Sequence, residues 1–236
     1  MVDGNFILQA RGLIKTYVNG EIETPALRGV DLELAAGEFV SVVGPSGCGK
    51  TTLLNLVGGL DRPTSGEITL DDVRLDLAGE RELSKVRLHN IGFVFQAYNL
   101  FPVLSAAENV EYVLMLRGIP AAERRRKALE LLETVGLSEM ADRRPTRLSG
   151  GQQQRVAVAR AISTNPRLVL ADEPTANLDS ESAGQLLDMM EALNRERGVT
   201  FLFSTHDPRV VERARRVVRL RDGLVVDGES GEDEQH

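Results

Sequence analysis

The sequence predicts an α/β protein with a mainly parallel β-sheet at its centre, an antiparallel β lobe at its N-terminus and an inserted helical segment. Three observations support this fold class. Short apolar strands alternate with helical patterns along the chain, a glycine-rich loop links one strand to one helix, and strand signals stop between about 97 and 155. Such alternation is typical of parallel sheets, because each crossover lays a helix on a face of the sheet.

The composition is that of an ordinary globular domain. The chain has 236 residues, of which 42% are hydrophobic and 27% are charged, and this is enough to bury a sizeable core. Its 28 basic and 35 acidic residues give a net charge of -7, so the chain as a whole does not attract a phosphodiester backbone, and we expect no nucleic-acid partner. The single cysteine, Cys48, leaves no internal disulfide and no cysteine-cluster metal site, which fits a reducing compartment.

The N-terminal residues and the apolar runs predict a cytoplasmic location. The first residues contain no basic segment followed by an apolar stretch, and no apolar run approaches the roughly 20 residues that cross a bilayer. Any role at the membrane therefore requires a partner. The last ten positions hold five acidic residues and no apolar residue, so we expect residues 229–236 to form a disordered acidic tail.

Strand signals open the chain and return at intervals. Residues 5 to 36 predict short strands, among which Val30, Leu32 and Leu34 alternate with acidic residues in the period of two that marks a half-buried antiparallel strand. Residues 39–43 are apolar and predict a buried strand. Further short strands of the parallel sheet are expected at 91–95, 168–171, 200–203 and 217–220.

Helical patterns fill the region between about 97 and 155. Residues 106–117 and 121–135 carry apolar positions at helical spacing, among them Leu129 and Leu132. We interpret this region as a subdomain inserted in the sheet domain. Its basic run at 124–127 could contact phosphate or lipid, but a solvated helix face is the favoured interpretation.

A phosphate-binding loop follows the strand at 39–43. Residues 44–51 match the pattern GxxxxGKT and lie between this strand and a helical pattern at 50–60. Glycines let backbone N–H groups point at a triphosphate, and the helix N-terminus adds partial positive charge. We expect Lys50 to reach the β and γ phosphates and Thr51 to offer its hydroxyl to Mg²⁺. The residues expected to bind ATP here are Gly44, Pro45, Ser46, Gly47, Cys48, Gly49, Lys50, Thr51 and Thr52.

A second chemical signal is an apolar strand that ends in two adjacent acids, Asp172 and Glu173. Beside a phosphate-binding loop, this pattern predicts that Asp172 binds Mg²⁺ and that Glu173 is the general base. Phosphoryl transfer leaves the protein mainly with positioning and charge stabilisation, and both tasks suit these carboxylates. The alternative, two solvated acids that close a strand, is favoured only where such a pair stands alone.

A second helix start suited to phosphate follows further along the chain. Residues 148–152 read Leu-Ser-Gly-Gly-Gln and precede a helical pattern at 153–164. Serine suits the N-cap position, and glycines at a helix start leave backbone N–H groups accessible to an anion. The alternative is a capped helix without a ligand. The residues of this segment expected to bind ATP are Ser149, Gly150, Gly151 and Gln152.

In their order along the chain, these motifs resemble those of the ABC (ATP-binding cassette) ATPases up to about Gly228. The resemblance implies a P-loop NTPase fold with a RecA-like core, ATP hydrolysis with Mg²⁺, and a homodimer in which each ATP lies between the phosphate-binding loop of one subunit and the Ser149 segment of the other. It also implies one domain over residues 1–228, with the β lobe and core at about 1–96 and 156–228 and a helical subdomain at about 97–155.

The resemblance assigns roles to four further residues. Tyr17 matches the aromatic residue that stacks on adenine, and Gln96 matches the glutamine that senses Mg²⁺ and the attacking water. Asp179 matches the aspartate at the dimer contact, and His206 matches the histidine that contacts the γ phosphate. The catalytic residues implied are Lys50, Gln96, Glu173 and His206, and the metal-binding residues implied are Thr51, Gln96 and Asp172.

Within the family, segments at 15–17, 58–66, 91–96 and 171–175 resemble the bacterial subgroup of lipoprotein-releasing, macrolide-exporting and cell-division ATPases. The resemblance implies a separate transmembrane permease as partner, a peripheral location at the inner face of the cell membrane, and export, extraction or mechanotransmission as the output. Two alternatives stay open. One is a cell-division ATPase that regulates a cell-wall hydrolase complex, and the other is a soluble ABC ATPase of DNA repair or translation.

The place of Cys48 in the phosphate-binding loop leads to one more expectation. A thiol beside a lysine and a helix N-terminus is reactive when solvent reaches it. We therefore expect alkylation to inactivate the nucleotide-free enzyme and ATP to protect it. The alternative is a small side chain that is buried against the sheet and inert.

Overall fold

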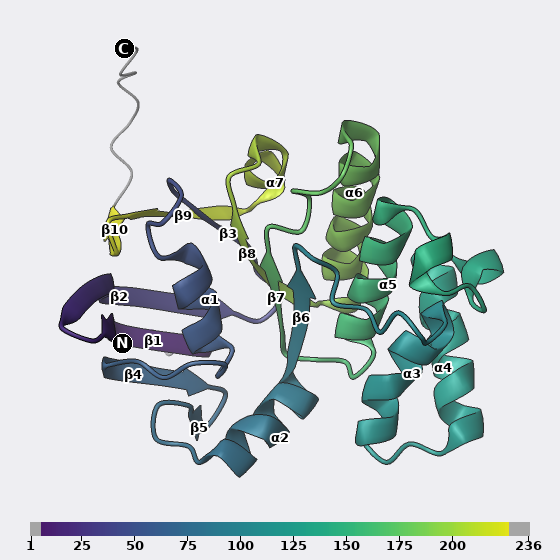
Figure 1. Ribbon diagram of the computed structural model, residues 1–236, viewed down its shortest axis with the longest axis horizontal. Coiled ribbons are helices and arrows are strands. Elements are labelled where there is room, and N and C mark those ends of the chain that lie inside the picture. Colours follow the sequence, from purple (N-terminus) through teal and green to yellow (C-terminus); the bar gives the residue numbers. More distant parts are fainter. Residues whose placement is uncertain (1–5, 227–236) are drawn as a thin grey trace.

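Parallel strands form the centre of the molecule, as predicted. The computed structural model describes residues 6–226 (Figure 1). Within this range one sheet has the strand order β10-β9-β3-β8-β7-β6, and its neighbouring strands are parallel except for the pair β10 and β9. These strands are β3 (Phe39–Val43), β6 (Ile91–Phe95), β7 (Leu168–Asp172), β8 (Thr200–Thr205), β9 (Arg216–Arg221) and β10 (Leu224–Val226).

The burial of these strands explains their central position. Every side chain of β8 is buried, and so are all those of β7 except the last. Continuous burial of this kind requires cover on both faces of the sheet, which is the situation of parallel strands in α/β proteins. The strands expected at 39–43 and 91–95 are confirmed at those residues, and β7, β8 and β9 extend one or two residues beyond the expected ranges.

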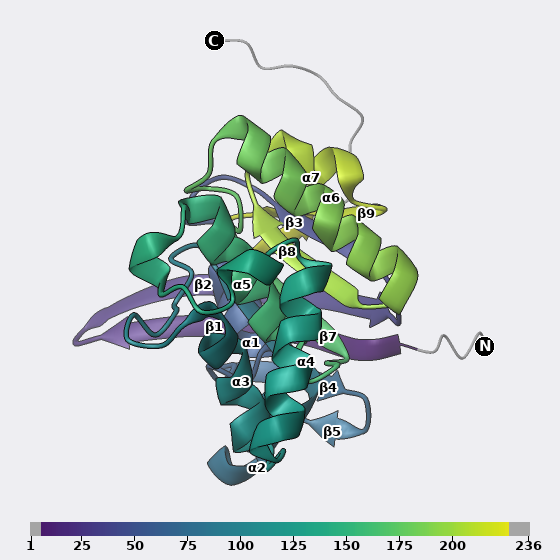
Figure 2. The same ribbon diagram turned by 90° about the vertical axis from the view of Figure 1, so that its right-hand side faces the viewer.

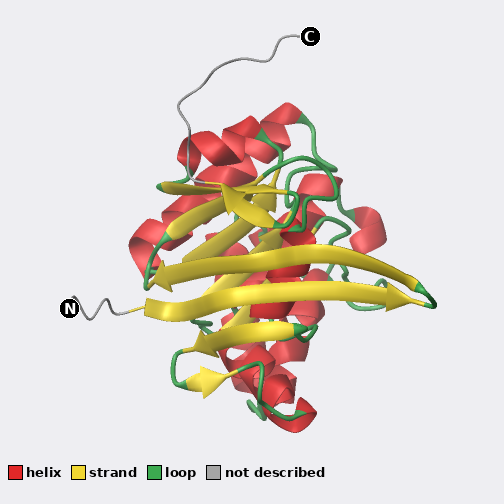
Figure 3. Cartoon of the chain, turned by 90° about the vertical axis from the view of Figure 1, so that its left-hand side faces the viewer, coloured by secondary structure: helices red, strands yellow, loops and turns green. Residues whose placement is uncertain are grey.

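The antiparallel lobe contains longer strands than the sequence predicted. Its strands are β1 (Phe6–Asn19), β2 (Ile22–Ala35), β4 (Ser65–Leu70) and β5 (Val73–Arg74), in the order β2-β1-β4-β5. The expectation of several short strands before residue 36 was wrong, because β1 and β2 have 14 residues each and accommodate their twist through irregularities in register. The alternation in β2 is confirmed, since Val30, Leu32 and Leu34 are buried. Figure 3 shows that the β1–β2 hairpin extends beyond the rest of the lobe.

Helices cover the two faces of the central sheet. Helix α1 (Lys50–Val57) lies between the sheet and the β lobe, and its buried residues Leu53 and Leu56 join a core shared with β1, β2 and β4 (Figure 1). Helices α5 (Gly150–Ile162) and α6 (Ser180–Arg197) cover the opposite face and bury their apolar side chains in a second core (Figure 2).

The region without strands is helical, as predicted. Helices α3 (Ala106–Leu116) and α4 (Ala121–Thr134) pack against each other and against α5. Two single-turn 3₁₀ helices, at Ser138–Met140 and Pro145–Arg147, lead the chain back to α5. Because α5 contacts both α3 and β6, it joins the helical region to the sheet.

The basic run on α4 is neutralised within the chain. Each of its four residues forms an ion pair with a carboxylate, and the partners are Glu111, Glu123, Glu130 and Asp142. This pairing supports the interpretation of a solvated helix face.

Two further helices, α2 (Glu80–Asn90) and α7 (Pro208–Arg213), complete the described part of the chain. The sequence did not predict α2, because only Leu83 and Val86 of this helix are buried and the helical periodicity is weak. Between residues 6 and 226 no helix has the length and apolar character needed to span a bilayer. The expected acidic tail at 229–236 lies outside the described residues.

Candidate nucleotide-binding and catalytic site

The predicted phosphate, metal and catalytic residues meet at one edge of the parallel sheet. Val43 at the end of β3 is in register with Thr205 at the end of β8, and Asp172 of β7 is in register with Phe95 of β6. Because these strands end at the same edge, the loops that follow them lie together, and this is where open α/β sheets bind ligands. A cavity of about 590 Å³ lies here. It is lined by Ala26, Gly44, Pro45, Ser46, Gly47, Gly49, Lys50, Thr51, Thr52, Gln96, Glu173, Ala176 and His206.

The phosphate-binding loop surrounds the amine of its own lysine. Lys50 Nζ donates hydrogen bonds to the carbonyl oxygens of Gly44 and Pro45 at 2.7 and 2.9 Å. Gly49 has φ 108°, and a Cβ at this position would lie 2.5 Å from the carbonyl oxygen of Ala26, so only glycine fits. The loop therefore places one cation at the start of α1, where backbone N–H groups are also available to an anion.

Thr51 and Asp172 form the candidate metal site. Thr51 Oγ1 donates a hydrogen bond to Asp172 Oδ1 at 3.2 Å. Both atoms are oxygens and one belongs to a carboxylate, which is the ligand chemistry that Mg²⁺ prefers, and Mg²⁺ is usually held by one or two carboxylates together with substrate phosphates. The residues present therefore fit Mg²⁺. Gln96, the third predicted metal ligand, lines the adjacent cavity.

Glu173 is held by two side chains from the end of β8. His206 Nδ1 lies 2.8 Å from Glu173 Oε1, and Thr205 Oγ1 donates a hydrogen bond to Glu173 Oε2 at 3.2 Å. The backbone of Glu173 has φ 47°, a left-handed value that is uncommon outside glycine, and its N–H donates to the Ser204 carbonyl at 2.8 Å. The carboxylate therefore faces the cavity from a fixed backbone position.

Gln154, a fully buried glutamine of α5, holds two of the loops around the cavity and was not predicted from the sequence. Its Nε2 donates to the carbonyl oxygens of Phe95 and Pro174 at 3.3 and 2.8 Å. These carbonyls flank Gln96 and Glu173, so one side chain fixes the backbone next to both residues. A glutamine within the helix pattern at 153–164 was the available signal, since a polar side chain on a buried face needs hydrogen-bond partners.

Asp207 links the loop after β8 to the loop after β7 and was not predicted from the sequence either. Asp207 is buried, and its carboxylate accepts hydrogen bonds from Thr175 Oγ1 at 2.7 Å and from Arg209 Nε at 2.9 Å. Burial raises the pKa of Asp207, but the hydrogen bonds from Arg209 and Thr175 outweigh burial and lower this pKa to about 2. Asp207 also caps α7, so the Asp-Pro pair before that helix was a signal for it.

The Ser149 segment does not line this cavity. Ser149 is the N-cap of α5 and forms a capping box with Gln152, in which Ser149 Oγ accepts from the Gln152 N–H at 3.2 Å and Gln152 Oε1 accepts from the Ser149 N–H at 3.0 Å. Ser149 is exposed, and the first turn of α5 carries no acidic residue. Within one chain, the structure does not bring Ser149, Gly150, Gly151 and Gln152 to the cavity that holds Lys50.

Tyr17 and Asp179 also lie outside the cavity. Tyr17 is 42% exposed on β1, its hydroxyl donates to Asp61 Oδ2 at 3.1 Å, and Lys15 Nζ lies 4.8 Å from the centre of its ring. Asp179 is the N-cap of α6 and accepts from the Ser182 N–H at 2.9 Å. The roles in adenine stacking and in the dimer contact stay predictions.

The expectation of a solvent-exposed thiol at Cys48 was wrong. The side chain is 4% exposed and packs in the core beside the β lobe, with its Sγ 4.0 Å from Lys50 Nζ. Burial of a small apolar thiol stabilises the folded state. Cys48 does not line the cavity, and its backbone N–H donates to the Pro45 carbonyl oxygen at 3.3 Å, so the contact with nucleotide expected for Cys48 stays a prediction.

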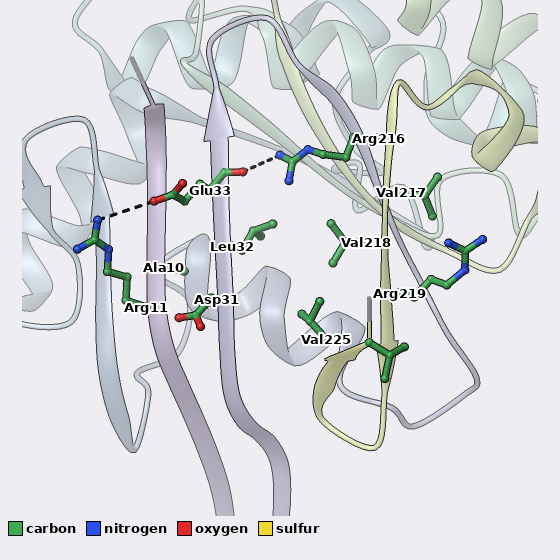
Figure 4. Close-up of a pocket in the computed structure, with 11 residues that line it drawn as sticks. Ala10, Arg11, Asp31, Leu32, Glu33, Arg216, Val217, Val218, Arg219 and Val225 are labelled. Atoms are coloured by element: carbon green, nitrogen blue, oxygen red, sulfur yellow. Dashed lines mark hydrogen bonds and ion pairs between the residues drawn. The ribbon is translucent and has the colours of Figure 1, made fainter. Parts of the chain in front are cut away.

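A second cavity, of about 550 Å³, lies between the β lobe and strands β9 and β10 (Figure 4). Two of its arginines already have partners. Arg11 Nη2 lies 3.8 Å from Glu33 Oε1, and Arg216 Nη2 donates to the carbonyl oxygen of Glu33 at 2.6 Å and to the carboxylate of Glu38 at 2.8 Å. None of the predicted site residues lines this cavity, so the candidate site is the cavity at the ends of the parallel strands.

Comparisons with known proteins agree with this geometry. The chain matches the family described as ABC transporter over residues 27–176, which is more than half of its length. LolD of Anaeromyxobacter dehalogenans, named a lipoprotein-releasing system ATP-binding protein, is 48% identical over 220 residues, which cover 93% of this chain and 92% of LolD. MacB of Syntrophobacter fumaroxidans, named a macrolide export ATP-binding/permease protein, is 48% identical over 95% of this chain, but this chain spans only 32% of MacB.

A solved structure shows the same fold. The ATP-binding cassette MJ0796 of Methanocaldococcus jannaschii, in a dimeric post-hydrolysis state bound to ADP and Pi, superposes with a TM-score of 0.87. The two chains are 44% identical, and the match covers 94% of this chain and 97% of MJ0796. The chain therefore belongs to the ABC transporter family as an ATP-binding subunit, and it is an ATPase.

Proposed function

We propose that two copies of this chain bind ATP head to tail, with each ATP between the phosphate-binding loop of one copy and the Ser149 segment of the other. The observation that carries this proposal is the separation of two helix starts within one chain. Helix α1 begins at the cavity, whereas α5 begins away from it. Neither first turn carries an acidic residue, and both leave N–H groups available, so each favours an anion. A second copy would bring both helix starts to one triphosphate, and the dimeric state of the MJ0796 cassette bound to ADP and Pi supports the pairing of two copies.

The roles proposed for the cavity residues follow from their chemistry. Lys50 binds the β and γ phosphates in place of its present carbonyl partners. Thr51 and Asp172 hold Mg²⁺, which neutralises charge on the phosphates when it is bound. Glu173 accepts a proton from the attacking water, and His206 contacts the γ phosphate. The distances among these side chains support the roles. Thr51 of α1 lies 3.2 Å from Asp172 at the end of β7, and Glu173, the next residue, lies 2.8 Å from His206.

We propose that Tyr17 stacks on the adenine and that Asp179 lies at the contact between the two copies. The Tyr17 ring is exposed, and its hydroxyl and the Lys15 amine share the carboxylate of Asp61. These contacts fix the ring before the base arrives, so stacking costs little conformational entropy. Asp179 begins α6 beside the Ser149 segment, since Ser182 of that turn lies against Gly151.

A groove beside Gln96 is the proposed docking surface for the permease. It has a volume of about 450 Å³ and lies between α2, β6, α3 and α5. Asn99, Phe101 and Leu116 line this groove. Phe101 is 42% exposed and Leu116 is 54% exposed. An apolar groove with exposed aromatic side chains suits an amphipathic helix of a partner. Because Asn99 is three residues after Gln96, a helix in this groove can sense the nucleotide through that short segment.

The proposed output is export or extraction of a molecule by a permease that holds this chain at the inner face of the membrane. The printed names of LolD and MacB support this proposal, since one belongs to a lipoprotein-releasing system and the other to macrolide export. The α3 wall of the groove belongs to the proposed helical subdomain at about 97–155, so docking there would couple movement of this subdomain to the permease.

Photo-cross-linking in membranes of the source cell tests the docking surface. A cross-linking amino acid at Phe101 should yield a product with an integral membrane protein, which mass spectrometry identifies. The matched control is the same group at Leu77, which is 73% exposed and lies outside the groove. Cross-linking to the same proteins from both positions, or to no membrane protein from Phe101, would contradict docking in this groove.

A further inference from the structure

A buried hydroxyl lies directly behind the proposed general base. Thr205, the last residue of β8, is 0% exposed, and its Oγ1 donates a hydrogen bond to Glu173 Oε2 at 3.2 Å. The same oxygen accepts a hydrogen bond from the Asp207 N–H at 2.9 Å. A hydroxyl has one proton to donate. Since the Asp207 N–H occupies a lone pair of Thr205 Oγ1, the proton is directed at the carboxylate of Glu173.

The other partner of Glu173 differs from Thr205 in its surroundings. His206 approaches Glu173 Oε1 at 2.8 Å, but its side chain is 74% exposed. An exposed imidazole changes its rotamer readily, and in the proposed mechanism it moves to the γ phosphate. Thr205 is enclosed in the sheet and has no such freedom, because side chains packed in a core stay in one rotamer. Of the two contacts, we therefore expect the one from Thr205 to persist when nucleotide is bound.

Asp207, which donates a hydrogen bond to Thr205 Oγ1, is itself held in place by other side chains. Asp207, whose N–H bonds to Thr205, is buried and accepts from Thr175 Oγ1 at 2.7 Å and from Arg209 Nε at 2.9 Å. Thr175 is 2% exposed and lies two residues after Glu173. A chain of three hydrogen bonds thus joins Glu173 to Thr205, Thr205 to Asp207 and Asp207 to Thr175. Its two ends, Glu173 and Thr175, belong to the same loop after β7. The bonds from Asp207 to Thr205 and from Thr175 to Asp207 are buried and the bond from Thr205 to Glu173 is partly buried, so the hydroxyl of Thr205 keeps one orientation.

We infer that Thr205 is a positioning residue for ATP hydrolysis, which holds the carboxylate of Glu173 in the orientation that accepts a proton from the attacking water. This inference rests on the proposed role of Glu173 as general base. Thr205 is buried and does not line the cavity, so we expect its effect on turnover to pass through Glu173. Loss of its hydroxyl should lower kcat and leave the KM for ATP nearly unchanged, because binding and proton transfer depend on different groups.

Steady-state ATPase kinetics of Thr205→Val test the inference. Valine keeps the shape of threonine and removes the hydroxyl, and we expect kcat to fall about tenfold while the KM for ATP stays within about twofold. Thr205→Ser restores the hydroxyl and should recover most of kcat. The matched control is Thr200→Val in the same strand, where a 1% exposed threonine accepts a hydrogen bond from the Gly37 N–H at 2.9 Å. Thr200→Val should lower the unfolding temperature by a similar amount and leave kcat unchanged.

A double-mutant cycle separates positioning from a structural role. If Thr205 acts only through Glu173, Thr205→Val should lower turnover no further in the Glu173→Gln background. Equal kcat in Thr205→Val and Thr200→Val, or additive losses in the double variant, would overturn the inference. If Thr205→Val does not fold, Thr205→Ala removes the same hydroxyl in a smaller side chain and is judged by the same criteria.

The cycle also distinguishes this inference from the proposed function. Normal turnover in Glu173→Gln would contradict both the proposed role of Glu173 as general base and the inferred role of Thr205. A large loss in Glu173→Gln with normal turnover in folded Thr205→Val overturns the inference and leaves the proposed base in place.

Discussion

The carboxylate of Glu173 lies 2.8 Å from the imidazole Nδ1 of His206, and the two residues follow the ends of the neighbouring parallel strands β7 and β8. We predict that Glu173→Gln binds ATP but hydrolyses it at least about a hundredfold more slowly, because the amide cannot accept the proton of the attacking water. The trapped ATP should also stabilise the dimer, so size-exclusion chromatography with ATP should show a dimer for Glu173→Gln. Near-normal phosphate release by this variant would contradict the role of Glu173.

The strand pattern identified Glu173, whereas His206 was assigned by the resemblance to the ABC ATPases, and the same topology accounts for the position of both. Each follows an apolar run that must be a buried strand, and parallel strands end at one edge of the sheet, so Asp172, Glu173 and His206 had to meet the phosphate-binding loop. The pattern could not show which of their neighbours support them. Gln154 and Asp207 link the loops around the cavity through hydrogen bonds to Phe95, Pro174 and Thr175, which are 20 to 59 positions away in sequence, and no local pattern reports such distant contacts.

In the β lobe, too, the sequence pattern predicted one strand but neither the pairing nor the length of the strands. The alternation around Val30 predicted a half-buried strand, but the pairing of β4 with β1 links residues that α1 separates in the sequence. The exposed halves of β1 and β2 carry no alternation, since neither face is covered there, and the length of these strands could therefore not be predicted from the sequence pattern.

Asp207 should make the stability of the protein depend on pH in the acid range. Its pKa is lowered from the ordinary 3.8 to about 2 in the folded protein, so the stabilisation is present above pH 4 and is lost as pH falls towards 2. We expect Asp207→Asn to lower the free energy of unfolding by about 2 kcal/mol at pH 7. The difference in the free energy of unfolding between the wild-type protein and Asp207→Asn should become smaller below pH 4, because protonated aspartate is as neutral as asparagine. Urea unfolding between pH 2 and pH 7 measures this difference, and a constant difference would contradict the assignment.

Cys48 should react slowly in the folded protein with or without ATP. Its thiol is 4% exposed in the core, so N-ethylmaleimide reaches it only through local opening. We expect labelling at least about a hundredfold slower than in urea-unfolded protein, measured by mass spectrometry of the intact chain. Rapid labelling that ATP prevents would show instead that the thiol faces the nucleotide.

Ser149 is also the N-cap of α5, so a test of its role in ATP hydrolysis needs a control for the stability that is lost with the cap. Ser105 forms an equivalent capping box with Glu108 at the start of α3 and does not line the cavity. Replacing either serine by alanine should cost about 1 kcal/mol of stability. Only Ser149→Ala should also abolish ATP hydrolysis, because only this helix start is proposed to contact the triphosphate of a second copy. Comparable ATPase losses in Ser105→Ala and Ser149→Ala would point to damage from the lost cap alone.

Mixing two inactive variants tests most directly the claim that ATP is hydrolysed between two copies of this chain. Lys50→Ala removes the amine of the phosphate-binding loop, and Ser149→Ala removes the partner segment, so each variant alone should lack activity. A mixed dimer contains one site in which both residues are intact. At equal concentrations, half of the dimers are mixed and half of their sites are intact, so activity should recover to about a quarter of the wild-type value. Differentially tagged subunits that form mixed dimers with ATP and show no recovered hydrolysis would contradict the shared site.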